Sequence, residues 1–209
     1  MTGKFITIEG GEGVGKSSNI AFILSYLENK KIRVTSTREP GGTELSEKIR
    51  TLLLDTENKS MTSDTELLLM FAARAQHLNE LIMPTLADNK WVLCDRFTDA
   101  TYAYQGGGRG ISISRIAELE SWVQGSLRPD LTILLDVPIE IGMKRASERS
   151  EPDRIEKEKN DFFESVRNTY LDMAKRSPER YRIIDASQSL IDVQNDIAKV
   201  LNDFIKKSQ

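Results

Sequence analysis

Short apolar stretches alternate with longer amphipathic stretches along the whole chain. The apolar stretches are rich in β-branched and aromatic residues and end at polar residues or glycine, a pattern typical of β-strands. Two of them, Trp91–Asp95 and Leu131–Asp136, are almost wholly apolar, which favours strands covered on both faces, as in a parallel sheet. We expect strands over residues 4–9, 32–37, 91–95, 131–136 and 182–185.

The amphipathic stretches carry apolar residues at helical spacing, as Ile20, Ile23 and Leu27 do within residues 17–29. Further helices are expected from residue 43 onward and over residues 62–79, 139–148, 161–175 and 190–205. Pro84 is expected to bend or interrupt the helical chain after residue 79. Because strands alternate with helices throughout, we predict an α/β fold of three layers, in which helices flank a five-stranded parallel sheet. The sequence shows no repeat or linker, so a single domain over residues 1–209 is expected.

Composition excludes several functions. The chain has 209 residues, a formal net charge of −3, one cysteine and one histidine. A lone cysteine cannot form an internal disulfide, and Cys94 with His77 cannot complete a zinc site. A Ser-His or Cys-His hydrolase would need His77 as its base. The slightly acidic balance argues against nucleic acid as the main partner.

The N-terminal residues lack the basic and then apolar layout of a secretory signal. The longest wholly apolar run, residues 67–73, is too short to cross a bilayer. We therefore expect a cytoplasmic protein without a membrane partner, and the single thiol agrees with that compartment.

One motif points directly to a ligand. Residues 10–17 match the phosphate-loop pattern G-x-x-x-x-G-K-[ST], and they lie between an expected strand and an expected helix. Glycines let backbone N–H groups surround an anion, and the following helix adds the positive end of its dipole. We expect Lys16 to reach the β- and γ-phosphates of a nucleotide and Ser17 to ligate Mg²⁺. The residues expected to bind ATP are Gly10, Gly11, Glu12, Gly13, Val14, Gly15, Lys16, Ser17 and Ser18.

The motif makes the expected fold one of the P-loop NTPase type, but it does not identify the reaction. Two apolar strands end in a carboxylate, and either Asp95 or Asp136 could hold the Mg²⁺ ion. Spacing favours Asp95, because Arg96 follows it and would put a guanidinium beside a metal-bound phosphate. Asp136 is followed by Val137-Pro138, which is more typical of a helix start.

Further motifs agree with one family. The sequence resembles bacterial thymidylate kinases along essentially its whole length, in the phosphate loop and in the segments 37–43 (TREPGGT), 95–97 (DRF) and 104–110 (YQGGGRG). The resemblance implies transfer of the γ-phosphoryl group of ATP to dTMP, giving dTDP and ADP. It also implies a need for Mg²⁺ and assembly as a homodimer.

The resemblance assigns residues to the acceptor nucleotide. It implies that Glu12 binds the sugar 3′-hydroxyl, although a solvated loop glutamate is the alternative. Arg38 and Arg96 resemble the clamp on the acceptor phosphate, a task that suits a planar, bidentate donor. Tyr104 would lie against the sugar and exclude a 2′-hydroxyl, unless it is only a core residue. Glu39 would orient Arg38, hold water around Mg²⁺, or form a structural ion pair.

A base pocket is expected around Phe71 and Arg74, which lie three positions apart and so share a helix face. The phenyl ring would stack on thymine, and the guanidinium would donate to its O4 atom. The family commonly has its aromatic residue four positions before the arginine, where this chain has Met70, so either residue could stack on the base. Thr101 and Gln105 also share a face and would offer a hydroxyl and an amide to the base edge.

A densely charged segment over residues 144–159 is either a solvated helix face or the lid that closes over ATP in this family. The phosphate loop has no arginine, so the resemblance puts the transition-state arginine in the lid. Arg149 is our first candidate and Arg154 the second, and Arg145 is expected to bind ATP by stacking or by phosphate contact. His77 is expected on a helix surface or in a helix contact, away from the chemistry.

The expected catalytic residues are therefore Lys16, Asp95, Arg96 and Arg149, and the expected metal ligands are Ser17 and Asp95. Two other functions remain open on the sequence alone. One is a kinase for another nucleotide or a deoxynucleoside. The other is a P-loop ATPase or switch protein that signals through a partner.

Overall fold

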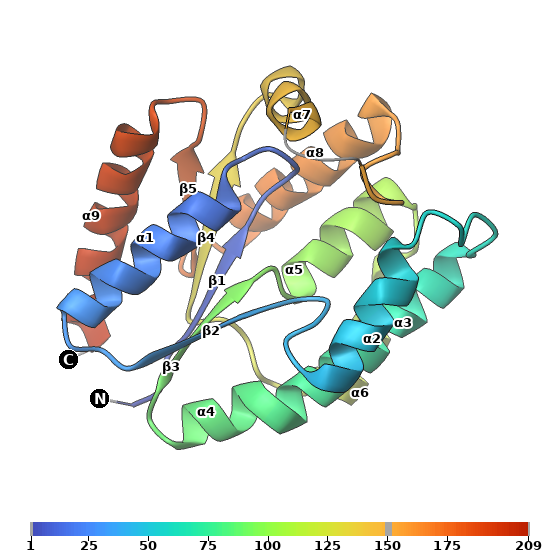
Figure 1. Cartoon of the computed structure of the whole chain (residues 1–209). Helices are drawn as coiled ribbons and strands as arrows, with labels where there is room; N and C mark the ends of the chain where they lie inside the picture. The colour runs from blue at the N-terminus through green and yellow to red at the C-terminus, as the bar shows by residue number, and fades with distance from the viewer. Residues whose placement is uncertain (1, 149–151, 209) are drawn as a thin grey trace.

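The computed structural model describes residues 2–148 and 152–208 as one α/β unit with a five-stranded sheet (Figure 1). All strand pairs are parallel, and the strand order is β2-β3-β1-β4-β5. The strands are β1 (Phe5–Glu9), β2 (Val34–Arg38), β3 (Trp91–Asp95), β4 (Leu131–Asp136) and β5 (Tyr181–Asp185). The predicted fold class is confirmed, and each expected strand is present within two residues of its expected ends.

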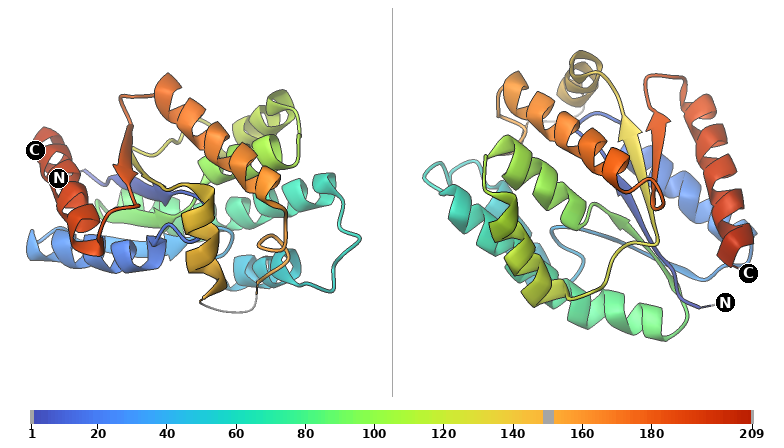
Figure 2. Two further views of the ribbon diagram at one scale, coloured as in Figure 1. Left: turned by 90° about the horizontal axis from the view of Figure 1, so that it is seen from above. Right: turned by 180° about the vertical axis from the view of Figure 1, so that it is seen from behind.

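Helices cover both faces of the sheet (Figures 1 and 2). The longer ones are α1 (Lys16–Asn29), α2 (Glu44–Leu54), α3 (Ser63–His77), α6 (Ile113–Gln124), α7 (Ile139–Ser147), α8 (Asn160–Arg176) and α9 (Leu190–Ser208). Shorter segments are the π-helical η1 (Leu78–Ile82) and η2 (Tyr102–Gly108), with α4 (Met83–Ala87) and α5 (Thr98–Thr101). No helix in the described ranges is both long and apolar enough to cross a membrane.

The helical run that begins at Ser63 does not stop near Asn79, as the sequence predicted, but continues through η1 to Ala87. Pro84 lies in the first turn of α4, directly after the π-helical segment. A proline has no N–H to donate and is tolerated in the first turn of a helix. The helical run therefore continues past Pro84, with the π-helical segment η1 directly before it.

The alternation of side chains along β1 divides the core. Ile6 and Ile8 are fully buried in the cluster formed with α1 and α9, whereas Phe5 packs on the opposite face with Val92 and Phe97. The same strand ends at the buried Glu9, and its neighbour β3 ends at Asp95. Since all strands run the same way, such polar ends lie together at the carboxyl edge of the sheet, where α/β folds bind ligands.

Candidate active site

The phosphate loop joins β1 to α1 at the carboxyl edge of the sheet. A side chain at Gly13 is excluded twice, because its φ is +68° and a Cβ atom would lie 1.8 Å from the carbonyl oxygen of Gly142. Lys16 Nζ donates back to the loop carbonyls of Gly11 at 3.1 Å and Gly10 at 3.4 Å. Burial lowers the pKa of Lys16, with the charge of Arg96 adding to the effect.

The other residues of the phosphate-loop motif differ in their burial and in their position relative to α1. Gly15 is the N-terminal cap of α1, in the left-handed conformation. Val14 is buried in the core cluster below the loop, so its side chain supports the loop. Ser17 and Ser18 are exposed in the first turn of α1.

A cavity of about 190 Å³ adjoins the phosphate loop. It lies between the loop, the ends of β2 and β3, helices α2 and α3, η2 and the segment before α8. Its lining residues are Glu12, Lys16, Glu39, Pro40, Arg50, Leu54, Met70, Arg74, Asp95, Arg96, Phe97, Ala100, Thr101, Tyr104, Gln105, Asp153, Ile155 and Glu156. Most of the residues predicted for the acceptor nucleotide therefore surround one space.

Glu12, Arg96 and Tyr104 form the part of this cavity nearest the phosphate loop. Arg96 Nη2 donates to Glu12 Oε1 at 2.7 Å, and the Tyr104 hydroxyl donates to the same oxygen at 2.8 Å. The Arg96 guanidinium also stacks on the Tyr104 ring, 4.6 Å from its centroid. Arg96 has a φ of +66°, which is uncommon for a non-glycine residue and aims its side chain from the end of β3 into the site.

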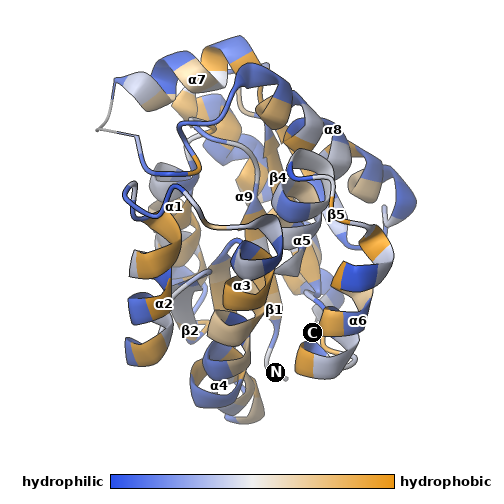
Figure 3. Ribbon diagram, turned by 90° about the vertical axis from the view of Figure 1, so that its right-hand side faces the viewer, coloured by the Kyte–Doolittle hydropathy of each residue, from blue (hydrophilic) through white to orange (hydrophobic). Residues whose placement is uncertain are grey.

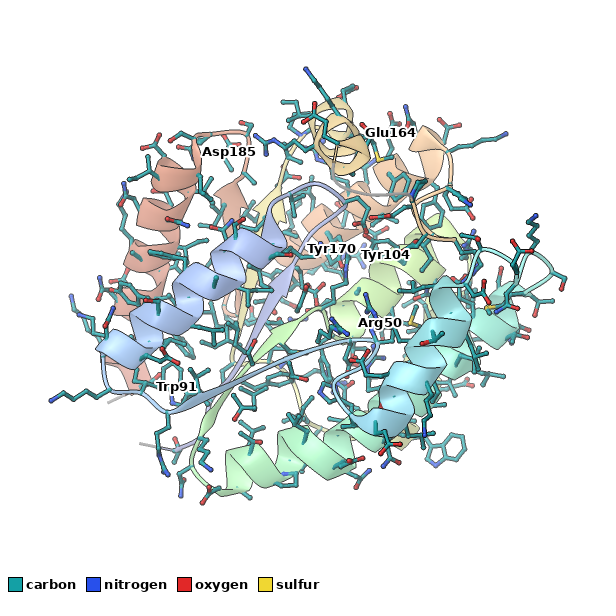
Figure 4. The ribbon with its side chains drawn as sticks, viewed as in Figure 1. Arg50, Trp91, Tyr104, Glu164, Tyr170 and Asp185 are labelled. Atoms are coloured by element: carbon teal, nitrogen blue, oxygen red, sulfur yellow. The ribbon has the colours of Figure 1, made fainter. Side chains whose placement is uncertain are left out.

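The ring of Tyr104 also packs near the ring of Tyr170, with centroids 6.4 Å apart (Figure 4). Burial raises the pKa of both hydroxyls well above the usual range, so both stay protonated and donate. Tyr170 donates to Glu9 Oε2 at 2.7 Å, and the Phe97 amide donates to Glu9 Oε1 at 2.7 Å. Burial raises the pKa of Glu9 to about 8, with the charge of Asp99 adding to the effect.

Arg74 is held at the opposite end of the cavity. Its Nε donates to Glu39 Oε2 at 2.7 Å, and its Nη2 donates to Thr101 Oγ1 at 2.9 Å. Arg74 Nη1 is buried and has no hydrogen-bond partner within the described ranges. One donor of a buried guanidinium is therefore available to a ligand in the cavity.

His77 is fully buried, not on a helix surface, and it joins this network. Its Nδ1 lies 3.0 Å from Glu39 Oε1, and its Nε2 lies 2.6 Å from Thr37 Oγ1. Both hydrogen bonds of the histidine therefore go to the end of β2 and the residue that follows it. Of the alternatives for Glu39, the structure favours an ion pair, with Arg74 as its partner in place of Arg38.

Phe71 does not line the cavity, contrary to the expectation that its ring stacks on a base. It is buried with Leu67, Ile111 and Ile116, and the Arg74 guanidinium lies 4.8 Å from its ring centroid. The predicted shared face is therefore present, but Phe71 supports Arg74 from the core. Met70 lines the cavity instead, because one residue along a helix turns the side chain by about 100°.

Thr101 and Gln105 both line the cavity, on α5 and η2. Gln105 Nε2 donates to Glu66 Oε1 at 2.9 Å. Glu66 is buried and also accepts hydrogen bonds from Arg109 and Arg154. Burial opposes ionisation of Glu66, but these donors outweigh it and lower the pKa of the carboxyl group.

Arg38 was expected to clamp the acceptor phosphate, but it lines a neighbouring concavity and not the main one. Its guanidinium pairs with Glu47 through Nη2 at 2.8 Å and Nε at 3.2 Å, and its side chain is 53% exposed. Arg50 lines the main cavity from α2 and donates to the Pro40 carbonyl at 2.8 Å (Figure 4). The sequence analysis missed Arg50, because a cation within an amphipathic helix looks like an ordinary solvated residue.

The concavity beside Arg38 brings Ser17 and Asp95 together. Asp95 Oδ1 is buried, and no described residue donates to it. Mg²⁺ usually takes one or two protein oxygens and completes its shell with phosphates and water, so a hydroxyl and an orphaned carboxylate oxygen fit this ion. Asp136, the alternative, is already held by Arg167 at 2.7 and 2.8 Å. The described ranges contain no cluster of three or more metal-binding side chains.

The charged segment expected to be a lid is divided. Arg145 lies in α7 and donates to the Ala186 carbonyl at 2.8 Å, whereas Asp153, Ile155 and Glu156 cover the acceptor cavity. Arg154 donates to the Leu53 carbonyl of α2 at 2.8 Å and to Glu66 of α3 at 2.6 Å. Arg149 lies outside the described residues.

Comparison with known proteins gives the family of the chain. The sequence profile named thymidylate kinase matches residues 8–197. The chain is 58% identical over 206 residues to the thymidylate kinase of Pseudomonas syringae pv. tomato, which covers 99% of this chain and 98% of that protein. It is 57% identical over 199 residues to that of Ruthia magnifica, covering 95% and 97% of the two chains.

Solved structures give the same result. The crystal structure of thymidylate kinase from Ehrlichia chaffeensis matches with a TM-score of 0.78 and 35% identity, over 97% of this chain and 99% of that chain. These matches decide against the switch protein and against a kinase for a different acceptor. The chain therefore belongs to the thymidylate kinase family, the enzymes that phosphorylate dTMP to dTDP.

Proposed function

We propose that the cavity beside the phosphate loop binds dTMP and that the loop holds the phosphates of ATP, so that the γ-phosphoryl group passes between them. The observation that carries this proposal is the junction at Glu12, Lys16 and Arg96. These three residues belong both to the phosphate-binding end of the site and to the wall of the cavity. Two nucleotides bound on either side of that junction would meet with their phosphates facing each other.

Phosphoryl transfer depends mainly on positioning and on neutralising negative charge. The acceptor phosphate of dTMP already has a nucleophilic oxygen, so this reaction needs no histidine base. Lys16 and Arg96 supply fixed positive charge at the junction, and Arg50 adds a third cation on the α2 side of the cavity. Arg38 would join the phosphate clamp if it exchanged Glu47 for the phosphate.

The far end of the cavity suits the thymine base. Arg74 Nη1 is a buried donor without a partner among the described residues, and the base atom O4 is an acceptor. Thr101 is held by Arg74, and Met70 offers an apolar surface to the ring. Tyr104, fixed by Glu12, would lie against the sugar and disfavour a ribose 2′-hydroxyl.

Mg²⁺ bound at Ser17 and Asp95 would neutralise charge on the β- and γ-phosphate oxygens of ATP. The support for this assignment is that Asp95 Oδ1 has no hydrogen-bond partner in the described part of the chain and that Asp95 lines the same concavity as Ser17. Arg145, held at the Ala186 carbonyl, would bind ATP by stacking or by phosphate contact. Arg149 remains our first candidate for the transition-state arginine, because the alternative, Arg154, is paired with Glu66.

We further propose that the chain forms a homodimer through the side that carries α3 and α6. Helices α3 and α6 pack against each other on the side of the molecule that Figure 3 shows. Large apolar side chains of these two helices are exposed, namely Leu68 at 57%, Ile113 at 55% and Trp122 at 82%. Exposed apolar side chains gathered on one side of a molecule favour a protein interface. Sedimentation velocity tests this proposal. Trp122→Glu should convert dimer to monomer, and a wild-type monomer at micromolar concentration would refute it.

A crystal structure with dTMP and a non-hydrolysable ATP analogue tests the arrangement as a whole. We expect the thymine base near Arg74 and Gln105, and the two phosphate groups near Lys16 and Arg96. Electron density for dTMP at any other place, or for the ATP analogue away from the phosphate loop, would refute the proposal.

A further inference from the structure

Glu66 is a buried carboxylate that the roles above do not use. It lies in the first turn of α3, and its side chain is 2% exposed. Three residues donate to it, namely Gln105 through Nε2 at 2.9 Å, Arg109 through Nε at 3.2 Å and Nη2 at 3.1 Å, and Arg154 through Nη2 at 2.6 Å. A buried carboxylate with so many donors stays ionised, since each hydrogen bond favours the charged form.

An ionised carboxylate can only accept hydrogen bonds, and this fixes the amide of Gln105. Only Nε2 of an amide group can face such a partner, so Oε1 has to lie on the opposite edge of the group. Gln105 lines the acceptor cavity, and none of the described residues donates to its Oε1 atom. Glu66 therefore turns the Gln105 side chain into a hydrogen-bond acceptor for whatever occupies the cavity.

Arg74 provides the opposite kind of group in the same cavity. Its Nη1 is a donor, is buried, and is unpartnered within the described part of the chain. Thymine and uracil have an acceptor at O4 and a donor at N3–H, which match a donor and an acceptor in the protein. Cytosine reverses both positions, because it has an amino group at C4 and a lone pair at N3.

We propose that Glu66 is a specificity-determining positioning residue, which holds Gln105 Nε2 so that Oε1 accepts the N3 proton of the base and 4-amino pyrimidines are rejected. The inference rests on the proposed function, because it requires the acceptor base to occupy this cavity. Glu66 itself does not touch the base and acts through Gln105.

The segment between α7 and α8 takes part in the same arrangement. Arg154 in that segment binds Glu66 directly, and Glu158 binds the Nη1 atom of Arg109 at 2.5 Å. Without these two arginines, burial would favour a protonated Glu66, which could donate to Gln105 Oε1 and reverse the amide. The two guanidinium groups thus keep the acceptor facing the base.

The test is the ratio of kcat/KM for dTMP to kcat/KM for dCMP, measured with the full chain. Glu66→Gln can both donate and accept, so Gln105 loses its fixed orientation, and we expect the ratio to fall by about tenfold or more. The ratio of dTMP to dUMP should stay within about twofold, because both bases have N3–H and O4. If Glu66 had only a structural role, Glu66→Gln would lower kcat/KM for all three substrates by about the same factor. An unchanged dTMP to dCMP ratio would overturn the proposal.

Glu158→Gln is the matched control, since it makes the same change in the same ion-pair network, and the hydrogen bond of Glu158 in the described structure goes to Arg109 and not to Gln105. Its dTMP to dCMP ratio should stay within about twofold of the wild type. If the ratio fell as much as it does in Glu66→Gln, the proposal would be overturned. The charge of the ion-pair network, and not the orientation of the Gln105 amide, would then determine the ratio.

Gln105→Met keeps the proposal falsifiable if Glu66→Gln does not fold. This variant removes the acceptor and leaves Glu66 with both arginines, so it should lower the dTMP to dCMP ratio by about tenfold or more. Adding Glu66→Gln to it should lower the ratio no further. An unchanged ratio in Gln105→Met would overturn the inference alone, whereas a wild type that does not phosphorylate dTMP would overturn the proposed function.

Discussion

Arg74 and Glu39 form a buried ion pair, with Nε and Oε2 2.7 Å apart and side chains that are 2% and 4% exposed. The pair connects α3 to the residue that follows β2, and His77 supports the same carboxylate. It therefore fixes a guanidinium that lines the acceptor cavity and whose Nη1 is buried with no hydrogen-bond partner among the described residues.

Glu39→Gln should weaken dTMP binding and lower stability, because it leaves Arg74 charged and buried without its counter-ion. Breaking a buried pair in this way costs about 3–5 kcal/mol. Urea unfolding should show the loss, and KM for dTMP should rise more than kcat falls. Glu44→Gln, which neutralises an exposed glutamate of a surface pair, is the control and should change neither quantity appreciably. Equal behaviour of the two variants would contradict the role assigned to Glu39.

Lys16→Ala should reduce kcat severely, by about 10²-fold or more, because it removes a fixed positive charge from the junction of the two nucleotides. The circular dichroism spectrum should be unchanged, since the hydrogen bonds of this side chain to described residues go to carbonyls of the phosphate loop. Lys59→Ala, a change at an exposed lysine, is the control. A near-normal rate in Lys16→Ala would refute its role in catalysis.

Arg149→Ala should lower kcat by about 10³-fold or more if this residue is the transition-state arginine. Single-turnover kinetics with saturating ATP and dTMP would measure the effect on the chemical step. Arg154→Ala should have a much smaller effect on that step, because Arg154 is bound to Glu66 and Leu53. A loss below about tenfold in Arg149→Ala would transfer the role to Arg154 or Arg145.

Glu9 should make stability depend on pH. Its pKa is raised from the ordinary value of 4.5 to about 8 in the folded protein, mainly by burial. The folded chain therefore keeps a proton that the unfolded chain has lost between these values. The contribution of Glu9 to the free energy of unfolding is fully present below about pH 4.5 and is lost as the pH rises through about 8.

Glu9→Gln resembles the protonated form at every pH, so the free energy of unfolding of this variant relative to wild type should increase from about pH 5 to about pH 9. Urea unfolding at several pH values measures this difference. Parallel stability curves for the two proteins would show that Glu9 is not protonated in the folded chain.

Much of the fold could be predicted, because its physical causes are local. The apolar runs of β3 and β4 and the glycine-rich turn after β1 each depend on a few neighbouring residues. The Gly10–Ser17 motif likewise predicts the loop and its helix together. The continuation of the α3 run past Pro84 was missed, because it depends on a π-helical change of register that has no simple sequence pattern.

The site was harder to predict where a role depends on tertiary partners. Arg38 and Arg50 are similar cations in the sequence, and only packing decides that Arg50 lines the cavity while Arg38 pairs with Glu47. Met70 and Phe71 are adjacent apolar residues, and only the rotation of α3 against the core distinguishes them. Glu66 was missed because its three donors come from distant segments.

The most direct test of the account is an ADP-release assay with ATP, Mg²⁺ and each of dTMP, dUMP, dCMP, dGMP and UMP as acceptor. The account predicts the highest kcat/KM for dTMP, because Arg74 and Gln105 match its base, and poor use of UMP, because Tyr104 crowds the 2′-hydroxyl. No turnover with dTMP above the background hydrolysis of ATP would contradict it.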